Sequence, residues 1–396
     1  MKVSFLNNIV FLLLVFEIVS CAQEPADVLI HKSFNLAPFY DSAHHWYDIH
    51  DEDRMINPLP DQKRYSPSEI RMIADNIIMF QKNNGGWTKN YDMQAVLTKE
   101  QKQAVINAKD ETNTTFDNGA TYSQVQYLAD VYTKTKDDKY KDVCIKGINF
   151  ILEAQYDNGG FPQFYPDRSG YRKYITFNDG AMIGVMELLY RISENAPEFS
   201  FIDEELHDKV KKAFNKGIDC ILKCQIVENG VKTAWCQQHD NVDFHPQNAR
   251  TFEPAAICNG ESTGIVFLLM QINNPSVEVI NSIQGAIKWF EESKIYGIKV
   301  IQVDSSHADY MYHSTDKDKV VAEDPDAPPI WTRFYEPVTH KPLFCRRDGK
   351  LVYSLAEVER ERRTGYRWYI DWPEFVLKLY PAWQKKWAPE NNVLEN

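Results

Sequence analysis

Two aspartates at similar places in the chain are the first residues that could do chemistry. Asp117 lies in DNGAT and Asp179 in NDGAM, and each precedes a run of apolar residues at helical spacing. A carboxylate there is an ordinary helix cap. Two such carboxylates could instead share a cation, since calcium binds carboxylate, amide and water oxygens and Asn118 adds an amide. They could also be the acid and base of a glycoside hydrolase, and spacing alone does not separate the three interpretations.

Further candidates lie later in the chain. Arg250, in ARTFEPA, is charged at neutral pH in water, so it should bind an anion or pair with Glu253 or Glu261. His239 and Asp240, in WCQQHD, could form a catalytic pair. No Ser or Cys nucleophile motif accompanies them, and a hydrogen-bonded structural histidine is therefore favoured.

An internal repeat is expected to position these residues. Three segments each hold an apolar run that ends in Gln, an Asn-Gly turn, and a second run that begins at Asn-Gly or Asp-Gly. Apolar residues recur at three- and four-residue spacing in all six runs, which is the helical period. Repeats of this length with two helices are typical of stacked helical hairpins. The Gln residues that end the first runs are Gln81, Gln155 and Gln225.

The repeat predicts a mainly α fold. We expect an α/α toroid, or partial barrel, of three helical hairpins over residues 66–295. The polar segments at 117–118, 179 and 250–261 should then meet on one face, because loops of a helical stack gather there. The first helix is expected to begin at Ser66 as part of a capping box.

Residues 296–380 have a different character. They are rich in Trp, Tyr, Pro and Arg, and short β-like runs occur at 297–303, 330–336 and 350–354. We expect a loop-rich segment with few strands that covers the loop face. Together with the repeats it would form one catalytic domain over 61–390. Within this segment, residues 341–372 hold eight Lys and Arg against five Asp and Glu. This local excess of basic residues could receive an acidic ligand or be a solvated charged face.

Composition limits the class of protein. The chain has 396 residues with 44 Lys and Arg, 56 Asp and Glu, and a net charge of −12. This acidic balance argues against nonspecific nucleic-acid binding, which needs a basic face. With 43% hydrophobic and 25% charged residues the composition is that of a globular protein.

The amino-terminal segment resembles a bacterial lipoprotein signal. Lys2 is followed by an apolar stretch over 9–19 that is too short to span a bilayer, and then by Ser-Cys at Cys21. The resemblance implies cleavage of residues 1–20, lipid on the Cys21 sulfur, and export to the outer membrane. Residues 21–60 would form a tether and lead-in, and membrane contact would run only through the anchor. An ordinary signal peptide with a chance Cys is the alternative.

The other six cysteines do not form a recognisable framework. Cys220 and Cys224 are four residues apart on an expected helix, which is poor disulfide geometry. No Cys-x-x-Cys pair is present, so a zinc or redox site is not expected. We predict scattered buried thiols.

Nine motifs together indicate a family. They occur in order along almost the whole chain after the signal and read NNGGWTKN, TTFDNGAT, GGFPQFYP, YITFNDGAM, WCQQHD, ARTFEPA, WTRFYE, KPLFCRRDG and GYRWYIDWP. The chain resembles a pectate lyase of polysaccharide lyase family 10. The resemblance implies an α/α toroid with loops over a cleft, and cleavage of α-1,4-linked polygalacturonate by β-elimination. It also implies Ca²⁺ as cofactor and an unsaturated product, and we expect a monomer.

The resemblance also implies roles for single residues. Arg250 matches the base that removes the proton at C-5. Asp117 and Asp179 match the acids that contact calcium, while Lys89 and Arg333 match positions that hold substrate carboxylates. The further positions assigned to the metal or the substrate are Asn118, Glu261, His239, Asp240 and Arg347.

Elimination needs no acid/base carboxylate pair. The C-5 hydrogen of a uronate is weakly acidic because its carboxylate resists further negative charge, and cations that neutralise this carboxylate stabilise the transition state. An Arg base must lose its proton first. We expect nearby calcium and Lys89 to disfavour its charged form and alkaline pH to supply the neutral one.

Three other classes remain as alternatives. An α/α-toroid glycoside hydrolase would use Asp117 and Asp179 without calcium and give saturated products. A noncatalytic glycan-binding surface lipoprotein would only capture its ligand. A terpene-cyclase-like barrel fits the spacing of Gln81 and Trp87, but the chain has no Asp-rich motif for it.

Overall fold

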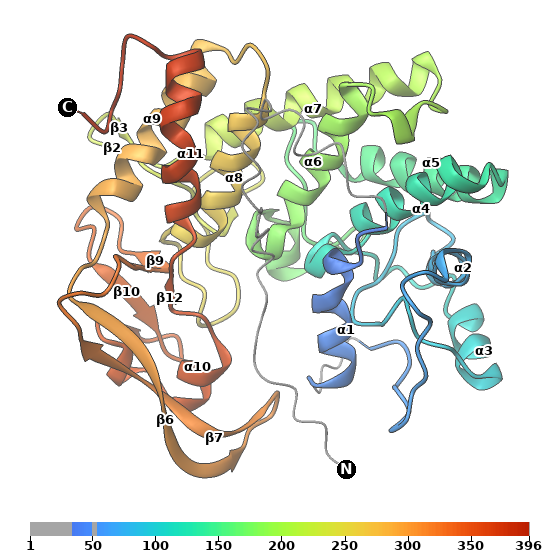
Figure 1. Cartoon of the computed structure of the whole chain (residues 1–396), viewed down its shortest axis with the longest axis horizontal. Helices are drawn as coiled ribbons and strands as arrows, with labels where there is room; N and C mark the ends of the chain where they lie inside the picture. Colours follow the sequence, from blue (N-terminus) through green and yellow to red (C-terminus); the bar gives the residue numbers. More distant parts are fainter. Residues whose placement is uncertain (1–33, 50–53, 396) are drawn as a thin grey trace.

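The computed structural model describes residues 34–49 and 54–395 of the chain (Figure 1). The predicted signal segment and Cys21 lie outside these residues, so cleavage and lipid attachment stay predictions. Within the described ranges no helix is both long and apolar enough to cross a membrane.

Stacked helices form two layers, as the repeat predicts. The second helices of the repeats pack side by side in one layer, and α11 (Pro373–Trp387) extends that layer next to the third of them. The first helices form the other layer, which α9 (Val277–Glu292) continues. The first helices are α2 (Ile70–Phe80), α5 (Asp138–Ala154) and α7 (Glu204–Cys224), and the second helices are α4 (Tyr122–Thr135), α6 (Ala181–Ser193) and α8 (Asn259–Gln271).

The Gln residue that ends each first helix joins neighbouring repeats. Gln81 follows α2, and its side-chain amide donates to the carbonyl of Gly85 at 2.8 Å and to that of Val143, in α5, at 3.1 Å. One amide therefore fixes its own turn and the next first helix. Gln155 bonds Gly159 and Ala213 in the same way, and Gln225 bonds Thr233 and Ser282.

The turn that follows α5, in the second repeat, needs a glycine. Gly159 has φ of +93°, and a Cβ there would lie 2.0 Å from the Lys216 carbonyl oxygen. Trp87, in the equivalent turn of the first repeat, is fully buried and donates to the Ile77 carbonyl at 2.8 Å. Its indole is part of the repeat core and not an exposed stacking surface for sugar.

One predicted helix boundary is wrong. The capping-box pattern placed the start at Ser66, whereas α2 begins at Ile70. The backbone N–H of Ser66 does donate to the Glu69 carboxylate at 2.6 Å, but the N–H of Glu69 returns to the Ser66 carbonyl. Residues 66–69 therefore close a turn before the helix. The remaining helices are α1 (Tyr40–Tyr47), α3 (Lys99–Asn107) and α10 (Arg360–Gly365).

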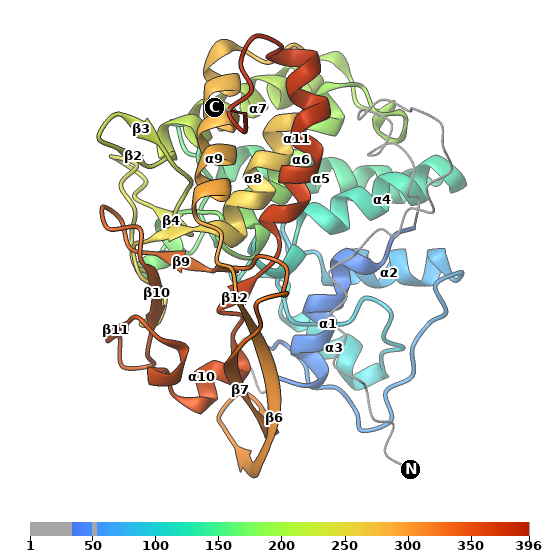
Figure 2. The same cartoon turned by 60° about the vertical axis from the view of Figure 1, so that its left-hand side comes forward.

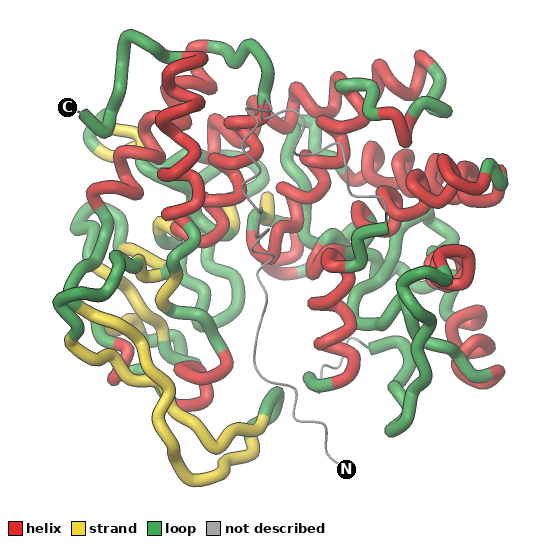
Figure 3. Tube along the Cα trace, in the orientation of Figure 1, coloured by secondary structure: helices red, strands yellow, loops and turns green. Residues whose placement is uncertain are grey.

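Most of the strands gather at one end of the molecule, below α8, α9 and α11, whereas the β2–β3 hairpin lies beside α9 (Figure 2). The predicted β-like runs are confirmed, but β7 was missed because its alternation is of charged and polar residues. It pairs with β6 in a long antiparallel hairpin that reaches away from the helices (Figure 3). The two-stranded sheets are β1–β4, β2–β3, β6–β7 and β8–β12, and the four-stranded sheet has the order β11–β10–β9–β5.

Strand bounds follow the chain order. The hairpin strands are β6 (Ile298–Asp309) and β7 (Ser314–Glu323). The others are β1 (Ile175–Thr176), β2 (Val227–Glu228), β3 (Val231–Lys232), β4 (Gln238–His239), β5 (Ile257–Cys258), β8 (Trp331–Thr332), β9 (Phe334–Tyr335), β10 (Pro342–Cys345), β11 (Leu351–Val352) and β12 (Tyr369–Ile370).

Two hydrophobic cores underlie this division. The larger core lies between the helical layers, and the smaller one lies under the strands around Phe252, Phe334, Phe344 and Trp368. The six cysteines in the described part of the chain are free and buried. The prediction of scattered thiols is confirmed for these six.

A half-buried acid on α4 should make stability depend on pH. Burial raises the pKa of Asp130 to about 7, and Glu198 adds to this. As pH rises from near 4, the unfolded carboxyl ionises first, so the folded state loses stability until the pKa of about 7 is passed.

We therefore expect Asp130→Asn to raise the free energy of unfolding by about 1–3 kcal/mol at about pH 8 and to change it little near pH 4. Urea unfolding of both proteins at the two pH values measures this. Asp138→Asn, at an acid whose side chain is 70% exposed, is the control. A gain of the same size at both pH values would contradict the assignment.

Candidate active site

Two short turns carry the aspartates. η3 (Asp117–Gly119) precedes α4, η5 (Asn178–Gly180) precedes α6, and the two turns pack against each other. Asn118 has φ of 51° and Asp179 has φ of 49°, in the left-handed region that residues other than glycine rarely adopt. Strained backbone of this kind tends to occur at functional sites.

The aspartates do not cap the helices that follow them. Asp117 accepts a hydrogen bond from Lys89 Nζ at 2.7 Å, and Asp179 accepts one from Asn178 Nδ2 at 2.6 Å. Neither carboxylate bonds to a helix N–H group in the described structure. The capping interpretation is therefore wrong for both.

Asp117 is a buried anion with an unused oxygen. Its side chain is 3% exposed, and its Oδ1 has no hydrogen-bond partner among the described residues. Burial alone would raise the pKa of Asp117, but Lys89, then the nearby Gln163 side chain and, at longer range, Arg250 lower it below its usual value. The carboxylate is thus held ionised next to an ammonium group, with one oxygen left for another ligand.

Asp179 differs in its electrostatics. It is accessible to solvent, yet the protein around it desolvates the carboxylate and, with repulsion from Asp117, raises its pKa to about 7. Two carboxylates that repel each other in this way are stabilised by a cation between them.

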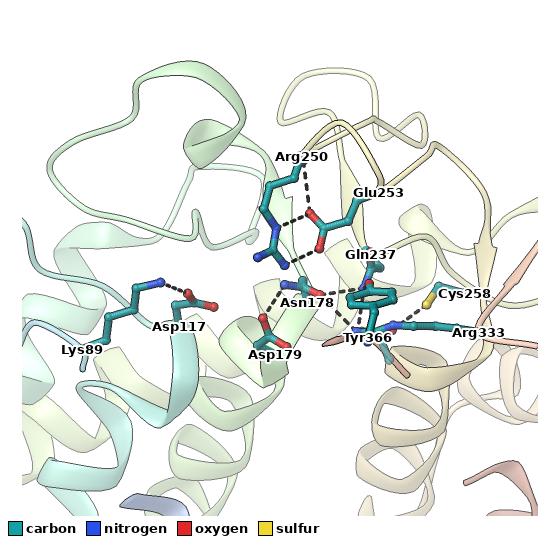
Figure 4. Close-up of polar contacts among 11 residues, drawn as sticks. Lys89, Asp117, Asn178, Asp179, Gln237, Arg250, Glu253, Cys258, Arg333 and Tyr366 are labelled. Atoms are coloured by element: carbon teal, nitrogen blue, oxygen red, sulfur yellow. Dashed lines mark hydrogen bonds and ion pairs between the residues drawn. The ribbon is translucent and has the colours of Figure 1, made fainter. Parts of the chain in front are cut away.

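Arg250 faces this pair from the third repeat (Figure 4). Its side chain is 45% exposed, and it is held by Glu253, whose side chain is 1% exposed. Nε donates to Glu253 Oε2 at 2.9 Å and Nη2 donates to Oε1 at 2.5 Å. The third nitrogen, Nη1, has no hydrogen-bond partner among the described residues, and the end of the side chain points toward Asp117 and Asp179 in Figure 4.

The charge state of Arg250 differs from the expectation. Burial alone would lower its pKa, but the Glu253 carboxylate, and then Asp179, raise the pKa above its ordinary value. Lys89 was expected to lower it, but Lys89 is paired with Asp117. In the absence of other cations the guanidinium is therefore held firmly protonated.

A polar network links Asp179 to the strand-rich part. Asn178, which bonds Asp179, accepts from Gln237 Nε2 at 2.6 Å and from Arg333 Nη2 at 3.3 Å. Gln237 and Arg333 also both bond the Glu261 carboxylate. Figure 4 shows this chain of contacts running from Asp179 to Cys258, whose thiol donates to Glu261 at 2.5 Å.

Arg333 and Glu261, which were expected to contact substrate, bind each other within this network. The side chains of Arg333 and Glu261 are 8% and 5% exposed and pair with each other. Burial alone would raise the pKa of Glu261, but Arg333 lowers it below its usual range. The Arg333 guanidinium also lies 4.5 Å from the Tyr366 ring. These placements favour a positioning role for Glu261.

His239 and Asp240 have structural roles. His239 is fully buried; its Nε2 accepts from the Cys236 N–H at 3.0 Å, and its Nδ1 lies 2.8 Å from the Phe244 carbonyl oxygen. Burial lowers its pKa to about 4. Asp240 accepts from the Val242 N–H at 2.8 Å and so fixes the following turn. The structure thus corrects the expectation of substrate contact for His239, because both ring nitrogens are used.

The remaining predicted residues lie at the edges of the site. Arg347 pairs with Glu361 at 2.7 Å and shares the Phe252 ring with Arg250, at 4.7 and 4.9 Å from its centre. Asn118 is buried and donates to Asn90 at 3.4 Å.

Sequence reasoning missed the residues that hold the others in place. Asn178, Gln237 and Tyr366 were not singled out, and Glu253 was considered only as a salt-bridge partner. Each of the four lies within one of the nine motifs. Only the motifs could have indicated them, since single polar residues carry no pattern of their own.

The protein alone offers an incomplete cation site. No group of three or more His, Cys, Asp or Glu residues in the described part of the chain could hold a metal ion. Asp117 and Asp179 supply two carboxylates, one with an unpartnered buried oxygen. Calcium takes six to eight oxygens, so a ligand that brings its own carboxylate, together with water, would have to complete the site.

Known proteins match the chain over most of its length. The model of the family described as pectic acid lyase matches residues 81–377. The solved structure of a family 10 polysaccharide lyase from Cellvibrio cellulosa has a TM-score of 0.66 and 29% sequence identity, and covers 80% of this chain and 95% of that chain. An Asp-to-Ala mutant of the Cellvibrio cellulosa lyase, in complex with trigalacturonic acid, has the same TM-score and identity and covers 80% of this chain and 96% of that chain. No curated protein sequence matches significantly.

Proposed function

The chain belongs to the pectic acid lyase family and has the α/α-toroid fold of the family 10 polysaccharide lyases, and we propose that it is a calcium-dependent pectate lyase. Its substrate would be α-1,4-linked polygalacturonate. The reaction would be a β-elimination with Arg250 as the base, and the products would be 4,5-unsaturated oligogalacturonates. The trigalacturonic acid bound to a mutant of the Cellvibrio cellulosa lyase supports this substrate class.

One observation carries the proposal. Arg250 points Nη1, which has no partner among the described residues, toward the carboxylates of Asp117 and Asp179, of which Asp117 is paired with Lys89 (Figure 4). An anionic uronate would be repelled by Asp117 and Asp179 unless a divalent cation joined them. The same arrangement suits elimination from a uronate, in which charge develops on the carboxylate.

Asp117 and Asp179 are the residues that would hold calcium, and Asn118 lies beside them. The unpartnered Oδ1 of Asp117 and the repulsion that raises the pKa of Asp179 both fit a bound cation. Bound there with the uronate carboxylate, calcium would neutralise that carboxylate and so make the C-5 hydrogen more acidic.

The residues of the chain perform the rest of the reaction. Neutral Arg250 takes the proton from C-5, and the electron pair of the broken C–H bond forms the C-4=C-5 double bond. The bond between C-4 and the glycosidic oxygen then breaks, and this oxygen leaves with the neighbouring sugar and takes a proton from solvent. Lys89 keeps Asp117 ionised and positioned, since the two are paired at 2.7 Å.

Activity should increase with pH through the alkaline range. Only the neutral form of Arg250 accepts a proton, and its pKa is raised above the ordinary value by Glu253 and Asp179. The neutral fraction then grows about tenfold per pH unit as long as pH stays below this pKa. Initial rates between neutral and alkaline pH, with calcium saturating at each point, measure the slope. A maximum at acidic pH would contradict Arg250 as the base.

A hydrolase is the second candidate, and one observation favours it. The pKa of Asp117 is lowered while that of Asp179 is raised to about 7, a separation that is also typical of an acid/base pair. Mass spectrometry of the products from a defined oligogalacturonate distinguishes the two. Elimination gives fragments whose masses sum to that of the substrate, whereas hydrolysis adds one water.

The amino-terminal sequence extends the proposal to an exported, lipid-anchored enzyme. The apolar stretch over 9–19 followed by Cys21 supports this. Labelled fatty acid that is incorporated into the full chain, but not into Cys21→Ser, would test the anchor.

A further inference from the structure

The contact between Arg250 and Glu253 is more specific than an ion pair. Three hydrogen bonds join the two residues. The backbone N–H of Arg250 donates to Glu253 Oε2 at 3.1 Å, Nε donates to the same oxygen at 2.9 Å, and Nη2 donates to Oε1 at 2.5 Å. The Glu253 N–H in turn donates to the Arg250 carbonyl at 2.8 Å. Residues 250–253 thus form a turn in which the side chain of the last residue binds the backbone and side chain of the first.

This turn fixes the orientation of the guanidinium. Glu253 is 1% exposed, so its carboxylate cannot swing into solvent, and both of its oxygens bind Arg250. The Phe252 ring lies 4.9 Å from the Arg250 guanidinium carbon and supports it from one side. Bidentate pairing of this kind fixes a planar guanidinium in one geometry.

The pairing with Glu253 also determines which nitrogen of Arg250 can lose a proton. A neutral guanidine has lost one hydrogen, and the nitrogen that lost it carries a lone pair, in tautomers that interconvert. To donate to Glu253, Nε must keep its single hydrogen and Nη2 the hydrogen that points at Oε1. Nη1 makes no such bond, has no partner among the described residues and faces Asp117 and Asp179 (Figure 4), so it is the nitrogen whose lone pair would be directed at the substrate.

We propose that Glu253 is a positioning residue that selects the reactive tautomer of Arg250, so that Nη1 is the atom that accepts the C-5 proton. The inference rests on the proposed elimination. Its logic is that of a carboxylate that holds a catalytic histidine in one tautomer. In each turnover Nη1 gains the proton, and the electron pair of the C–H bond enters the C-4=C-5 double bond as the bond from C-4 to the glycosidic oxygen breaks. That oxygen takes a proton from solvent, and Nη1 later returns its proton to solvent.

Several charged groups act on Arg250 and set the pH at which it works. Glu253 from its own turn, Asp179 from η5 and Tyr366, which follows α10, all favour the protonated form. Arg347 also contacts the Phe252 ring, at 4.7 Å from its centre. Removing the charge of Glu253 should therefore lower the pKa of Arg250 and shift the pH profile, whereas a change of side-chain shape alone should not.

Two variants separate orientation from charge. Glu253→Gln keeps the length of the side chain and removes its charge, and Glu253→Asp keeps the charge and shortens the reach. We expect Glu253→Asp to lower kcat about 10- to 100-fold with a wild-type pH profile, because the shorter carboxylate holds the Arg250 guanidinium in a shifted position. We expect Glu253→Gln to lower kcat as well, and its rate to level off at alkaline pH where the wild-type rate still rises.

A matched control is available in a second buried pair. Glu198 pairs with Arg191 away from the site, with side chains 8% and 18% exposed, so Glu198→Gln reports the effect of breaking such a pair on folding. Thermal unfolding of all variants confirms that they fold. The proposal is overturned if Glu253→Gln and Glu253→Asp both keep the wild-type kcat and pH profile.

A measurement without turnover keeps the inference separate from the proposed function. In ¹⁵N-arginine-labelled protein, the Nε–H signal of Arg250, assigned by its loss in Arg250→Lys, should be protected from exchange and become exposed in Glu253→Gln. An unprotected signal in the wild type would overturn the pairing. If the signal behaves as expected but wild-type protein gives no unsaturated product, the elimination fails and the pairing stands.

Discussion

Arg250→Ala should lower the rate of unsaturated product formation by on the order of 10³-fold, because a positioned general base contributes about 10²- to 10⁴-fold. This is the largest single effect that we expect in the chain. Nη1 of Arg250 faces the aspartate pair and has no hydrogen-bond partner in the described part of the chain. Initial rates with polygalacturonate at alkaline pH and saturating calcium measure the loss.

The control for this variant is an arginine outside the site. Arg71 is similarly accessible, with its side chain 53% exposed against 45% for Arg250, and it pairs with Asp137 at 3.3 Å. Arg71→Ala should keep the wild-type rate. Arg250→Lys should also be strongly impaired, since an ammonium group cannot reproduce the two bonds to Glu253 and leave a free nitrogen. An Arg250→Ala enzyme with more than a tenth of the wild-type rate would refute the role of this residue.

The second large effect should appear at the cation site. Asp179→Asn keeps the shape of the side chain and removes its charge, and Asn178 can still contact it. We expect the calcium concentration for half-maximal activity to rise roughly 100-fold or more, since ligand charge sets the affinity of such sites. Calcium titrations of activity, and of calcium binding followed by calorimetry with trigalacturonate present, measure this.

Asp41 offers a matched control for charge alone. It lies exposed on α1 and contributes to the raised pKa of Asp179 through its field. Asp41→Asn should change the calcium requirement only slightly, because Asp41 is not a ligand. If Asp41→Asn and Asp179→Asn shift the calcium requirement equally, Asp179 acts through charge and is not a ligand.

Helical periodicity was enough to predict the repeats and their order. The three terminal Gln residues could be recognised because each makes the same pair of bonds between neighbouring repeats. The pattern also predicted that the second-helix starts converge, and the structure places η3, η5 and the Arg250 turn at one site. It could not predict that residues 66–69 form a turn before the helix instead of its first turn, since Ser66 and Glu69 can contact each other in either geometry.

The state of the site residues depended on contacts that sequence does not show. Glu253 was considered as one of two partners for Arg250, and only the fold places its two oxygens on Nε and Nη2. Glu261 was assigned to substrate, but it is buried against Arg333. His239 lies in a motif because it fixes a loop, and a motif does not separate residues that fix loops from residues that bind ligands.

We propose that Arg250 and a calcium site together perform an elimination. The most direct measurement follows the ultraviolet absorbance of unsaturated product when the soluble chain from Ala22 onward acts on polygalacturonate at alkaline pH, with calcium and with excess chelator. We expect an absorbance rise that requires calcium and is absent in Arg250→Ala. Growth of reducing ends without any absorbance rise would contradict it and return Asp117 and Asp179 to the roles of acid and base.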